Sequence, residues 1–225
     1  MIFNKYSKDA SYSYVFGAFG TIELLKNKAN ECLAVLVDPS FTNNEAYKII
    51  LDICKKNNIK VIVDLKTINK IKDKGNIFVI GVFNKYTSTL DNNNHLVVYK
   101  NNDVGSIGTI IRSMRGFNFS NLVLIDCDID LYHEHLIRST MGAFFQCNIK
   151  QYNNIESYLN EYKDKTFVNI SSSGENLSSL KVTNNLSIIF SKESIVNQNI
   201  TNIEFNEDLP LENIVNIVLF SIYKD

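Results

Sequence analysis

The sequence has few of the residues and patterns that mark specialised classes of protein. Only two of its 225 residues are Pro and nine are Gly, which argues against collagen-like and low-complexity chains. No apolar run approaches the length of a membrane span, and the first residues lack the apolar core of a signal peptide. We therefore expect a cytoplasmic protein without a membrane partner. A hydrophobic content of 45% and a charged content of 21% indicate an ordinary globular fold.

The chain also lacks signs of a metal site and an overall excess of basic charge. Its four cysteines show no CxxC spacing and lie in or beside apolar runs, which favours buried, reduced thiols over metal ligands or disulfides. His133 and His135 are two residues apart, so on a helix they point to different faces, and we expect no metal. The formal net charge is −1, so nucleic-acid binding would need a local basic patch.

Strand-like and helix-like patterns alternate along the chain. The polar stretch "NKYTSTLDNNNH" has no period and is the best linker candidate, so we predict a small α/β domain over 1–88 and a second domain over 95–225. The alternation predicts a mostly parallel sheet with helices on both faces. Ligands of such sheets bind beyond the carboxyl ends of the strands, so the polar loops after "VVYK", "FVNI" and "SIIF" are candidate sites.

One junction between a strand and a helix, "DVGSIGTIIRSMRG" at 103–116, combines glycines with arginines. Gly105 and Gly108 permit tight turns, and Ser106 is a possible helix cap. The stretch lacks the full dinucleotide fingerprint and the Lys of a P-loop. Arg112 is one turn into the helix, where a guanidinium suits a phosphate or a developing oxyanion. Arg115 fits a solvated helix face equally well.

From these residues onward, the chain resembles the SpoU/TrmH branch of the SPOUT RNA methyltransferases. "DVGSIGTIIR" is similar to the family's first motif, and "RSTMGA" at 138–143 is similar to the second. The third motif is eroded: "IIFSKES" keeps Glu193 but has serines in place of both glycines, and "LEN" keeps only Asn213. The segment "FGAFGTIELLKNK" is similar to the family's small N-terminal domain, which itself resembles a ribosomal RNA-binding protein.

The resemblance implies an activity, a cofactor and an assembly. Members of the family transfer a methyl group from S-adenosylmethionine to a ribose 2′-hydroxyl of RNA, here rRNA or tRNA. The implied catalytic domain is a parallel sheet with a deep trefoil knot, and it works as a homodimer without a metal. The implied cofactor residues are Ser171, Ser172, Phe190, Ser191, Ile203, Phe205 and Leu211.

The resemblance also implies roles for polar residues. Arg112, Glu193 and Asn213 would be catalytic, with Arg112 stabilising the forming alkoxide or gripping a phosphate, because arginine stays protonated and is a poor base. Glu193 is also readable as a solvated loop carboxylate, and Asn213 as a cap of the last helix. The implied RNA contacts are Ser106, Arg115, Arg138 and Lys26.

Two other functions remain open at this point. The erosion of the third motif, and Ser106 where the family has Asn, are compatible with a homodimer that binds RNA or a protein without catalysis. The chain is also compatible with an unrelated α/β enzyme that uses the GxxG turn at 105–108 as an anion site.

Overall fold

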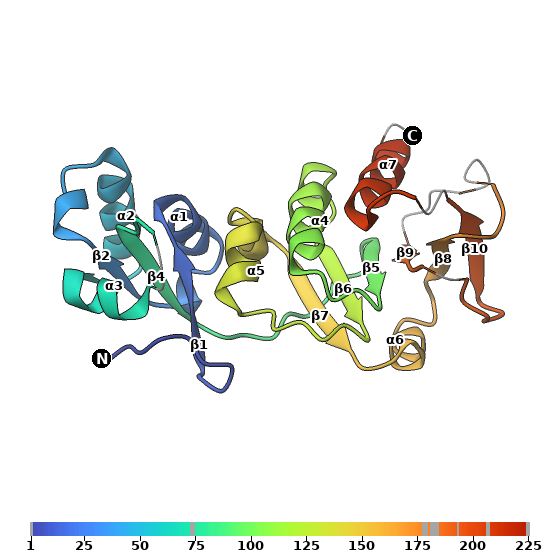
Figure 1. The fold of residues 1–225 in the computed structure, drawn as a ribbon, viewed down its shortest axis with the longest axis horizontal. Coiled ribbons are helices and arrows are strands. Elements are labelled where there is room, and N and C mark those ends of the chain that lie inside the picture. The colour runs from blue at the N-terminus through green and yellow to red at the C-terminus, as the bar shows by residue number, and fades with distance from the viewer. Residues whose placement is uncertain are drawn as a thin grey trace. The chain divides into compact units, whose positions relative to one another are not determined.

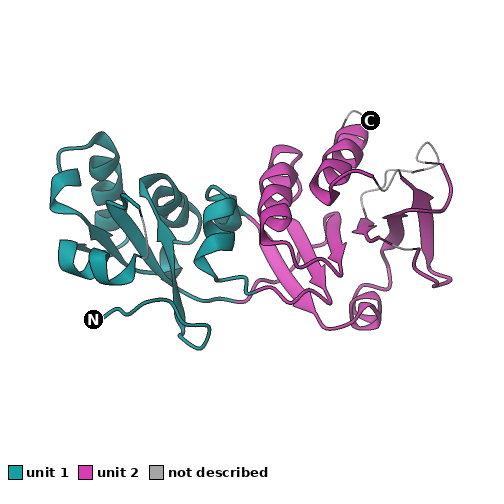
Figure 2. Ribbon diagram, viewed as in Figure 1, with its two compact units in different colours: residues 1–86, 130–146 teal, residues 87–129, 147–225 magenta. Residues whose placement is uncertain are grey.

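The computed structural model describes residues 2–72, 75–176, 180, 185–192, 194–205 and 208–223. The chain forms two compact units (Figure 2), which we describe separately. Unit 1 comprises 1–86 and 130–146, and unit 2 comprises 87–129 and 147–225. The division into domains 1–88 and 95–225 stays a prediction. The compact units differ from it because 130–146, which contains the second sequence motif, packs within unit 1.

Unit 1 is an α/β unit built on a mixed four-stranded sheet with the order β1-β4-β2-β3. β4 runs antiparallel to β1 and β2, and β3 runs parallel to β2. The core contains buried aliphatic side chains of β2 and β4, such as Leu36 and Val82. The elements are β1 (Tyr12–Phe16), α1 (Ala18–Asn27), β2 (Cys32–Val37), α2 (Glu45–Lys56), β3 (Lys60–Val63), α3 (Leu65–Ile71), β4 (Val79–Asn84) and α5 (Glu134–Ser139), with 3-10 turns at Ala29–Glu31, Pro39–Phe41 and Ala143–Gln146.

The segment 130–146 contributes the second motif to unit 1. Thr140 is buried and its hydroxyl donates to the carbonyl of Ile137. Gly142 has a φ of +85°, and a Cβ at this position would lie 2.8 Å from Cγ of Glu23 on α1. Only a glycine fits this left-handed turn against α1 without displacing a side chain. The motif therefore shapes a turn in unit 1.

Unit 2 contains the parallel sheet that the sequence predicts. The six strands have the order β10-β8-β9-β5-β6-β7, and every adjacent pair is parallel. The elements are β5 (His95–Tyr99), α4 (Val104–Gly116), β6 (Asn121–Ile125), β7 (Asn148–Tyr152), α6 (Ile155–Glu161), β8 (Thr166–Ser171), β9 (Leu186–Phe190), β10 (Ile200–Glu204) and α7 (Leu211–Tyr223). The trefoil knot stays a prediction.

Helices cover both faces of this sheet, as predicted. α4 and α7 pack together on one side and α6 lies on the other (Figure 1). Ile155 and Tyr158 of α6 pack against Val97, Val123 and Ile189, which share one face of the sheet because side chains alternate along a strand. Burial of all five residues of β6 and of β9 is typical of strands covered on both faces.

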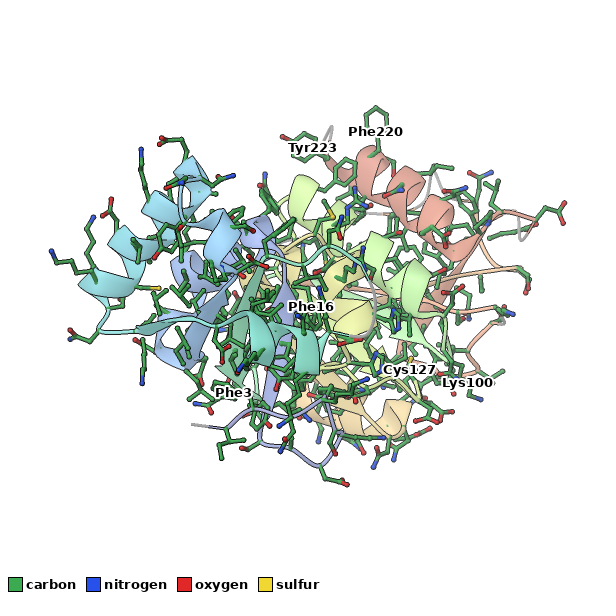
Figure 3. The ribbon with its side chains drawn as sticks, turned by 60° about the vertical axis from the view of Figure 1, so that its left-hand side comes forward. Phe3, Phe16, Lys100, Cys127, Phe220 and Tyr223 are labelled. Carbon is green, nitrogen blue, oxygen red and sulfur yellow. The ribbon has the colours of Figure 1, made fainter. Side chains whose placement is uncertain are left out.

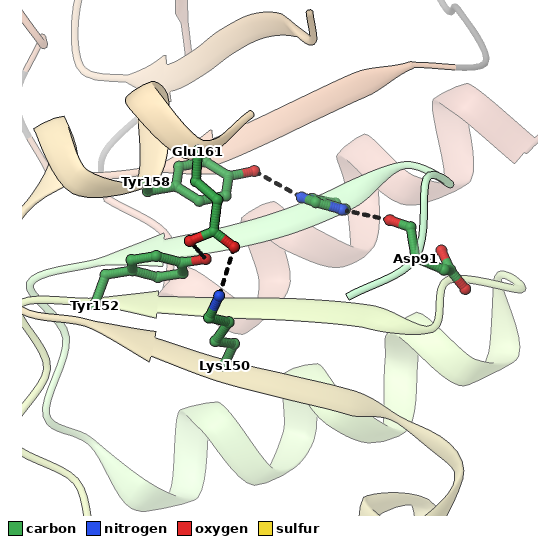
Figure 4. A network of polar contacts seen from close by, with 6 residues as sticks. Asp91, Lys150, Tyr152, Tyr158 and Glu161 are labelled. Atoms are coloured by element: carbon green, nitrogen blue, oxygen red, sulfur yellow. Dashed lines mark hydrogen bonds and ion pairs between the residues drawn. The ribbon is translucent and has the colours of Figure 1, made fainter. Parts of the chain in front are cut away.

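A buried polar network closes the amino-terminal edge of the sheet (Figure 4). His95 is fully buried, and its Nε2 lies 3.0 Å from the carbonyl oxygen of Asp91, which only accepts. Nε2 therefore carries the proton, and Nδ1 accepts from the hydroxyl of Tyr158 at 2.8 Å. That hydroxyl in turn accepts from Oγ of Ser187 at 2.6 Å. Burial lowers the pKa of His95 to about 4, so the ring is neutral near pH 7.

The burial of most cysteines agrees with the prediction from their apolar surroundings. All four cysteines are free, and three of them are buried. None of the described helices combines the length and apolarity that a bilayer crossing requires.

Candidate active site

A cavity of about 260 Å³ lies at the carboxyl-terminal edge of the unit 2 sheet. The ends of β5, β8 and β9, the residue that follows β10 and the first turn of α7 form its walls. Its described lining residues are Tyr99, Lys100, Asn101, Ile170, Ser171, Ser172, Phe190, Ser191, Lys192, Phe205, Leu209, Leu211 and Ile214. The cavity therefore occupies the place where parallel α/β sheets bind ligands.

The structure brings six of the seven predicted cofactor residues to this cavity: Ser171, Ser172, Phe190, Ser191, Phe205 and Leu211. The seventh, Ile203, is only 1% exposed inside β10, where it pairs with Ile170 of β8. Ile203 therefore supports the wall from behind, because its position in the strand points its side chain into the core.

Side-chain amides of β8 and β10 hold the cavity wall in position. Oγ of Ser191 donates to Oδ1 of Asn169 at 2.9 Å, and Nδ2 of Asn169 donates to Oδ1 of Asn202 at 2.8 Å. Asn169 and Asn202 are register partners on β8 and β10. The backbone N–H of Phe205 donates to the carbonyl of Ser171 at 2.8 Å. These bonds fix three strand ends relative to one another without using a charged group.

Gly174 brings the loop after β8 against β10. A Cβ on Gly174 would lie 2.3 Å from the backbone oxygen of Asn202 and 2.8 Å from the nitrogen of Ile203. The next residue, Glu175, forms a parallel bridge with Ile203. A side chain at position 174 would force this loop away from β10, so glycine is required by close approach.

The glycines at 105 and 108 do not form a phosphate loop. Both lie inside α4, whose N-cap is Asp103. The Asp103 carboxylate accepts from the backbone N–H groups of Gly105 at 2.7 Å and Ser106 at 3.2 Å. The predicted cap, Ser106, is wrong, and because a carboxylate already occupies this helix terminus, the anion site considered for the GxxG turn is disfavoured.

Ser106 has a different structural role from the predicted cap. Its Oγ donates to Oε2 of Glu212 at 2.7 Å, which ties the first turn of α4 to the first turn of α7. Ser106 does not line the cavity. Its role in RNA binding stays a prediction.

Arg112 lies on the exposed face of α4 and is not among the described lining residues of the cavity. The apolar face of the helix, with Ile107, Ile110, Ile111 and Met114, is buried. Its helical position faces away from the sheet, so Arg112 does not reach the cavity of its own chain, and its catalytic role stays a prediction. Arg115 is partly buried on the same helix.

The remaining predicted residues are dispersed. Asn213 is exposed in the first turn of α7, where its backbone N–H donates to the carbonyl of Pro210. Glu193 lies outside the described residues. Arg138 and Lys26 are exposed residues of unit 1, and Nζ of Lys26 lies 3.5 Å from Oε1 of Glu23.

Sequence analysis missed the two lysines that line the cavity, Lys100 and Lys192. Lys100 is the last residue of "VVYK" and Lys192 lies in the loop after "SIIF", so both positions were an available signal. Nζ of Lys100 lies 4.0 Å from Oδ2 of Asp126. Figure 3 shows Lys100 and Cys127, which follow the ends of β5 and β6. Burial raises the pKa of the Cys127 thiol, so the thiol stays protonated near pH 7.

The described residues contain no group of three or more His, Cys, Asp or Glu side chains arranged to hold a metal. The cavity instead combines hydroxyls, backbone groups at strand ends and apolar side chains. This combination fits an organic ligand with a flat apolar part and several polar edges.

A family model matches the part of the chain that builds this edge. The model of the SpoU rRNA Methylase family matches residues 93–202. These residues belong to the SpoU family. The matched residues include the strands from β5 to β9 and most of the cavity wall, whereas α7 lies beyond residue 202. No curated protein sequence matches the chain.

Solved structures have the same fold at low sequence identity. The AdoMet-bound rRNA methyltransferase from Sinorhizobium meliloti has a TM-score of 0.74 and 16% identity, over 95% of this chain and 87% of that chain. The SpoU methyltransferase AviRb from Streptomyces viridochromogenes, in complex with AdoMet, has a TM-score of 0.76 and 13% identity, over 95% and 90%. An RNA 2′-O ribose methyltransferase has a TM-score of 0.70 and 14% identity, over 95% and 88%.

Proposed function

We propose that the chain is an S-adenosylmethionine-dependent RNA methyltransferase that methylates a ribose 2′-hydroxyl of rRNA or tRNA. The observation that carries this proposal is the cavity at the carboxyl ends of β5, β8 and β9, within a region of the SpoU family. Two structural neighbours contain AdoMet, and a third is a 2′-O ribose methyltransferase.

The residues of the cavity fit the proposed cofactor. Its volume of about 260 Å³ is near the lower end of small-molecule pockets, which is roughly 300 Å³. Phe190, Phe205 and Leu211 can cover an adenine ring, while the hydroxyls of Ser171 and Ser172 and the strand-end backbone can bind its polar edges. When bound, S-adenosylmethionine supplies an electrophilic methyl group.

The contribution of the chain to this reaction is mainly positional. The described lining residues include no carboxylate and no histidine, so the titratable side chains of this part of the wall are Tyr99, Lys100 and Lys192. The cavity aligns the acceptor oxygen and excludes water, and a nearby cation stabilises the charge that develops on that oxygen as its proton leaves.

The distribution of charge supports RNA as the substrate. Unit 1 contains 13 lysines and one arginine against ten acidic residues, a formal charge of +4. Unit 2 contains nine basic and 14 acidic residues, a formal charge of −5. The near-neutral net charge of the chain is therefore the sum of a basic unit 1 and an acidic unit 2. We propose that unit 1 binds the RNA backbone and unit 2 holds the cofactor.

We propose further that the protein works as a homodimer in which Arg112 completes the cavity of the partner subunit. α7 presents an apolar stripe of Ile217, Phe220 and Tyr223, which are 44%, 50% and 58% exposed. Figure 3 shows Phe220 and Tyr223 on the outer side of the helix. Sedimentation equilibrium tests this directly: a dimer is expected, and a monomer at micromolar concentration would contradict it.

Transfer of a radiolabelled methyl group to total rRNA and tRNA tests the activity. Methylation of a 2′-hydroxyl removes the nucleophile of alkaline hydrolysis, so the label should remain in an alkali-resistant dinucleotide. Label released as a methylated mononucleotide would indicate base methylation and contradict the proposed site on the ribose.

A second candidate function is RNA binding without catalysis. The exposed position of Arg112 and the absence of a carboxylate or histidine among the described lining residues favour it. Calorimetry separates the two functions, because a catalyst binds S-adenosylhomocysteine and a degenerate relative gives no heat of binding.

A further inference from the structure

The cavity contains a pair of cations that no sequence motif predicts. Lys100 and Lys192 both line it, and none of its other described lining residues is charged. Unit 2 has only nine basic residues and a formal charge of −5, so two lysines in one cavity represent a local reversal of its charge.

The strand register places the two lysines at the same level. Val98 of β5 pairs with Phe190 of β9, and each lysine follows two residues later. Neighbouring strands are about 4.8 Å apart, so the two side chains line one cavity from adjacent strands.

The backbone at Lys100 is strained in a way that serves this arrangement. Lys100 has a φ of +56°, a left-handed conformation that favours glycine. Its N–H still donates to the carbonyl of Ile125 at 2.9 Å, so the strand turns directly after its last ladder bond. Strained non-glycine residues cluster at functional sites, because other conformations do not place the side chain there.

Local contacts orient the Lys100 ammonium at the rim. Nζ lies 5.0 Å from the centroid of the Tyr99 ring and 4.0 Å from Oδ2 of Asp126. The side chains of Lys100 and Asp126 are 60% and 54% exposed, so this ion pair is weak and leaves the ammonium accessible to an approaching anion.

We propose that Lys100 and Lys192 form a clamp for the RNA phosphate adjacent to the target ribose. The inference deepens the proposed function, on which it rests for the identity of the anion. RNA binding places a phosphate close to every 2′-hydroxyl, so a cation pair at the mouth of the cavity fixes the ribose relative to the methyl donor. Arg112 cannot supply this contact in its own chain, since it does not line the cavity.

The test compares the double variant Lys100→Met/Lys192→Met with Lys163→Met, an exposed lysine of unit 2 that lies outside this cavity. The probe is a fluorescent single-stranded 12-nucleotide RNA of mixed sequence, with Kd measured between 50 and 300 mM KCl, about the range in which phosphate contacts dominate affinity. Because the two lysines hold one phosphate, we expect the double variant to lower the slope of log Kd against log salt by about 0.7, and Lys163→Met to leave it unchanged.

Affinity for S-adenosylhomocysteine, measured by calorimetry, should change less than twofold in the double variant. An unchanged salt slope would overturn the clamp, as would a loss of S-adenosylhomocysteine binding with normal RNA affinity, which would assign the lysines to a ligand carboxylate. An equal effect of Lys163→Met would also overturn it, because any surface charge would then suffice.

The Lys100→Gly variant tests the strain independently. Glycine adopts the left-handed backbone without penalty, so this variant should unfold at a higher temperature than wild type while binding RNA more weakly. A lower melting temperature, or unchanged RNA affinity, would contradict the assigned role.

These outcomes separate the clamp from the proposed function. Methyl transfer by wild type with an unchanged salt slope in the double variant would refute the clamp alone. A lysine-dependent slope in a protein that transfers no methyl group would refute the activity alone.

Discussion

Replacing Tyr158 by Phe should destabilise the sheet far more than the loss of one hydroxyl usually does. The Tyr158 hydroxyl donates to Nδ1 of His95 and accepts from Oγ of Ser187, and all three residues are fully buried. The change therefore leaves two polar groups unsatisfied away from water. Each costs roughly 1–3 kcal/mol, so we expect a loss of about 4 kcal/mol in the free energy of unfolding.

Urea denaturation followed by circular dichroism measures this loss. With an m-value of about 2 kcal/mol/M, the midpoint should fall by about 2 M. Tyr152→Phe is the matched control, because the Tyr152 hydroxyl donates at 2.9 Å to the solvent-exposed carboxylate of Glu161 (Figure 4) and should lose less than about 1 kcal/mol. If Tyr158→Phe also lost less than about 1 kcal/mol, the inferred proton arrangement around His95 would be refuted.

Three further predictions concern protonation, packing and catalysis. His95 has a pKa of about 4 in the folded protein and a normal value of 6.5, so the unfolded chain binds more protons between these values. The free energy of unfolding should therefore fall by about 3 kcal/mol as the pH drops from 6.5 to 4. An equally steep fall in the His95→Gln variant would exclude the histidine as its cause. Gly174→Ala should cost about 1–3 kcal/mol and weaken S-adenosylhomocysteine binding in calorimetry, whereas Gly116→Ala, with open space around its Cβ, should do neither; equal effects would show that close approach is unimportant. Arg112→Ala should abolish methyl transfer while changing stability by less than about 0.5 kcal/mol, and full activity would remove it from the mechanism.

The architecture of unit 2 was predictable because its strands are continuous apolar runs. "NLVLI" and "LSIIF" are buried on both faces, and their composition alone indicates a parallel sheet. β1 and β7 were not predicted from the sequence. "NIKQY" of β7 is at the edge of the sheet and mostly polar, so it carries little hydrophobic signal.

Helix ends were predicted less well than helix positions. Thr21 has a residue type that the capping rule favours, yet it lies buried inside α1, and its hydroxyl donates to the carbonyl of Gly17. Asp103 rather than Ser106 caps α4. Several polar residues near a helix start satisfy the same sequence rule, and only the tertiary contacts, here between Ser106 and Glu212, decide which one is used.

Some residues of the candidate site could be predicted from the sequence and others could not. Residues at the ends of strands, such as Ser171 and Phe190, could be assigned to one cavity because parallel strands bring their carboxyl ends to one edge. The orientation of Arg112 could not be predicted, since it depends on which face of α4 packs on the sheet. The lysine pair depends on strand order, which the sequence does not specify.

The most direct test of the account is a crystal structure of the protein grown with S-adenosylhomocysteine. We predict that the ligand lies at the carboxyl ends of β5, β8 and β9, with its adenine against Phe190, Phe205 and Leu211. A ligand bound elsewhere, or this cavity left empty at saturating concentration, would contradict the methyl-transfer function.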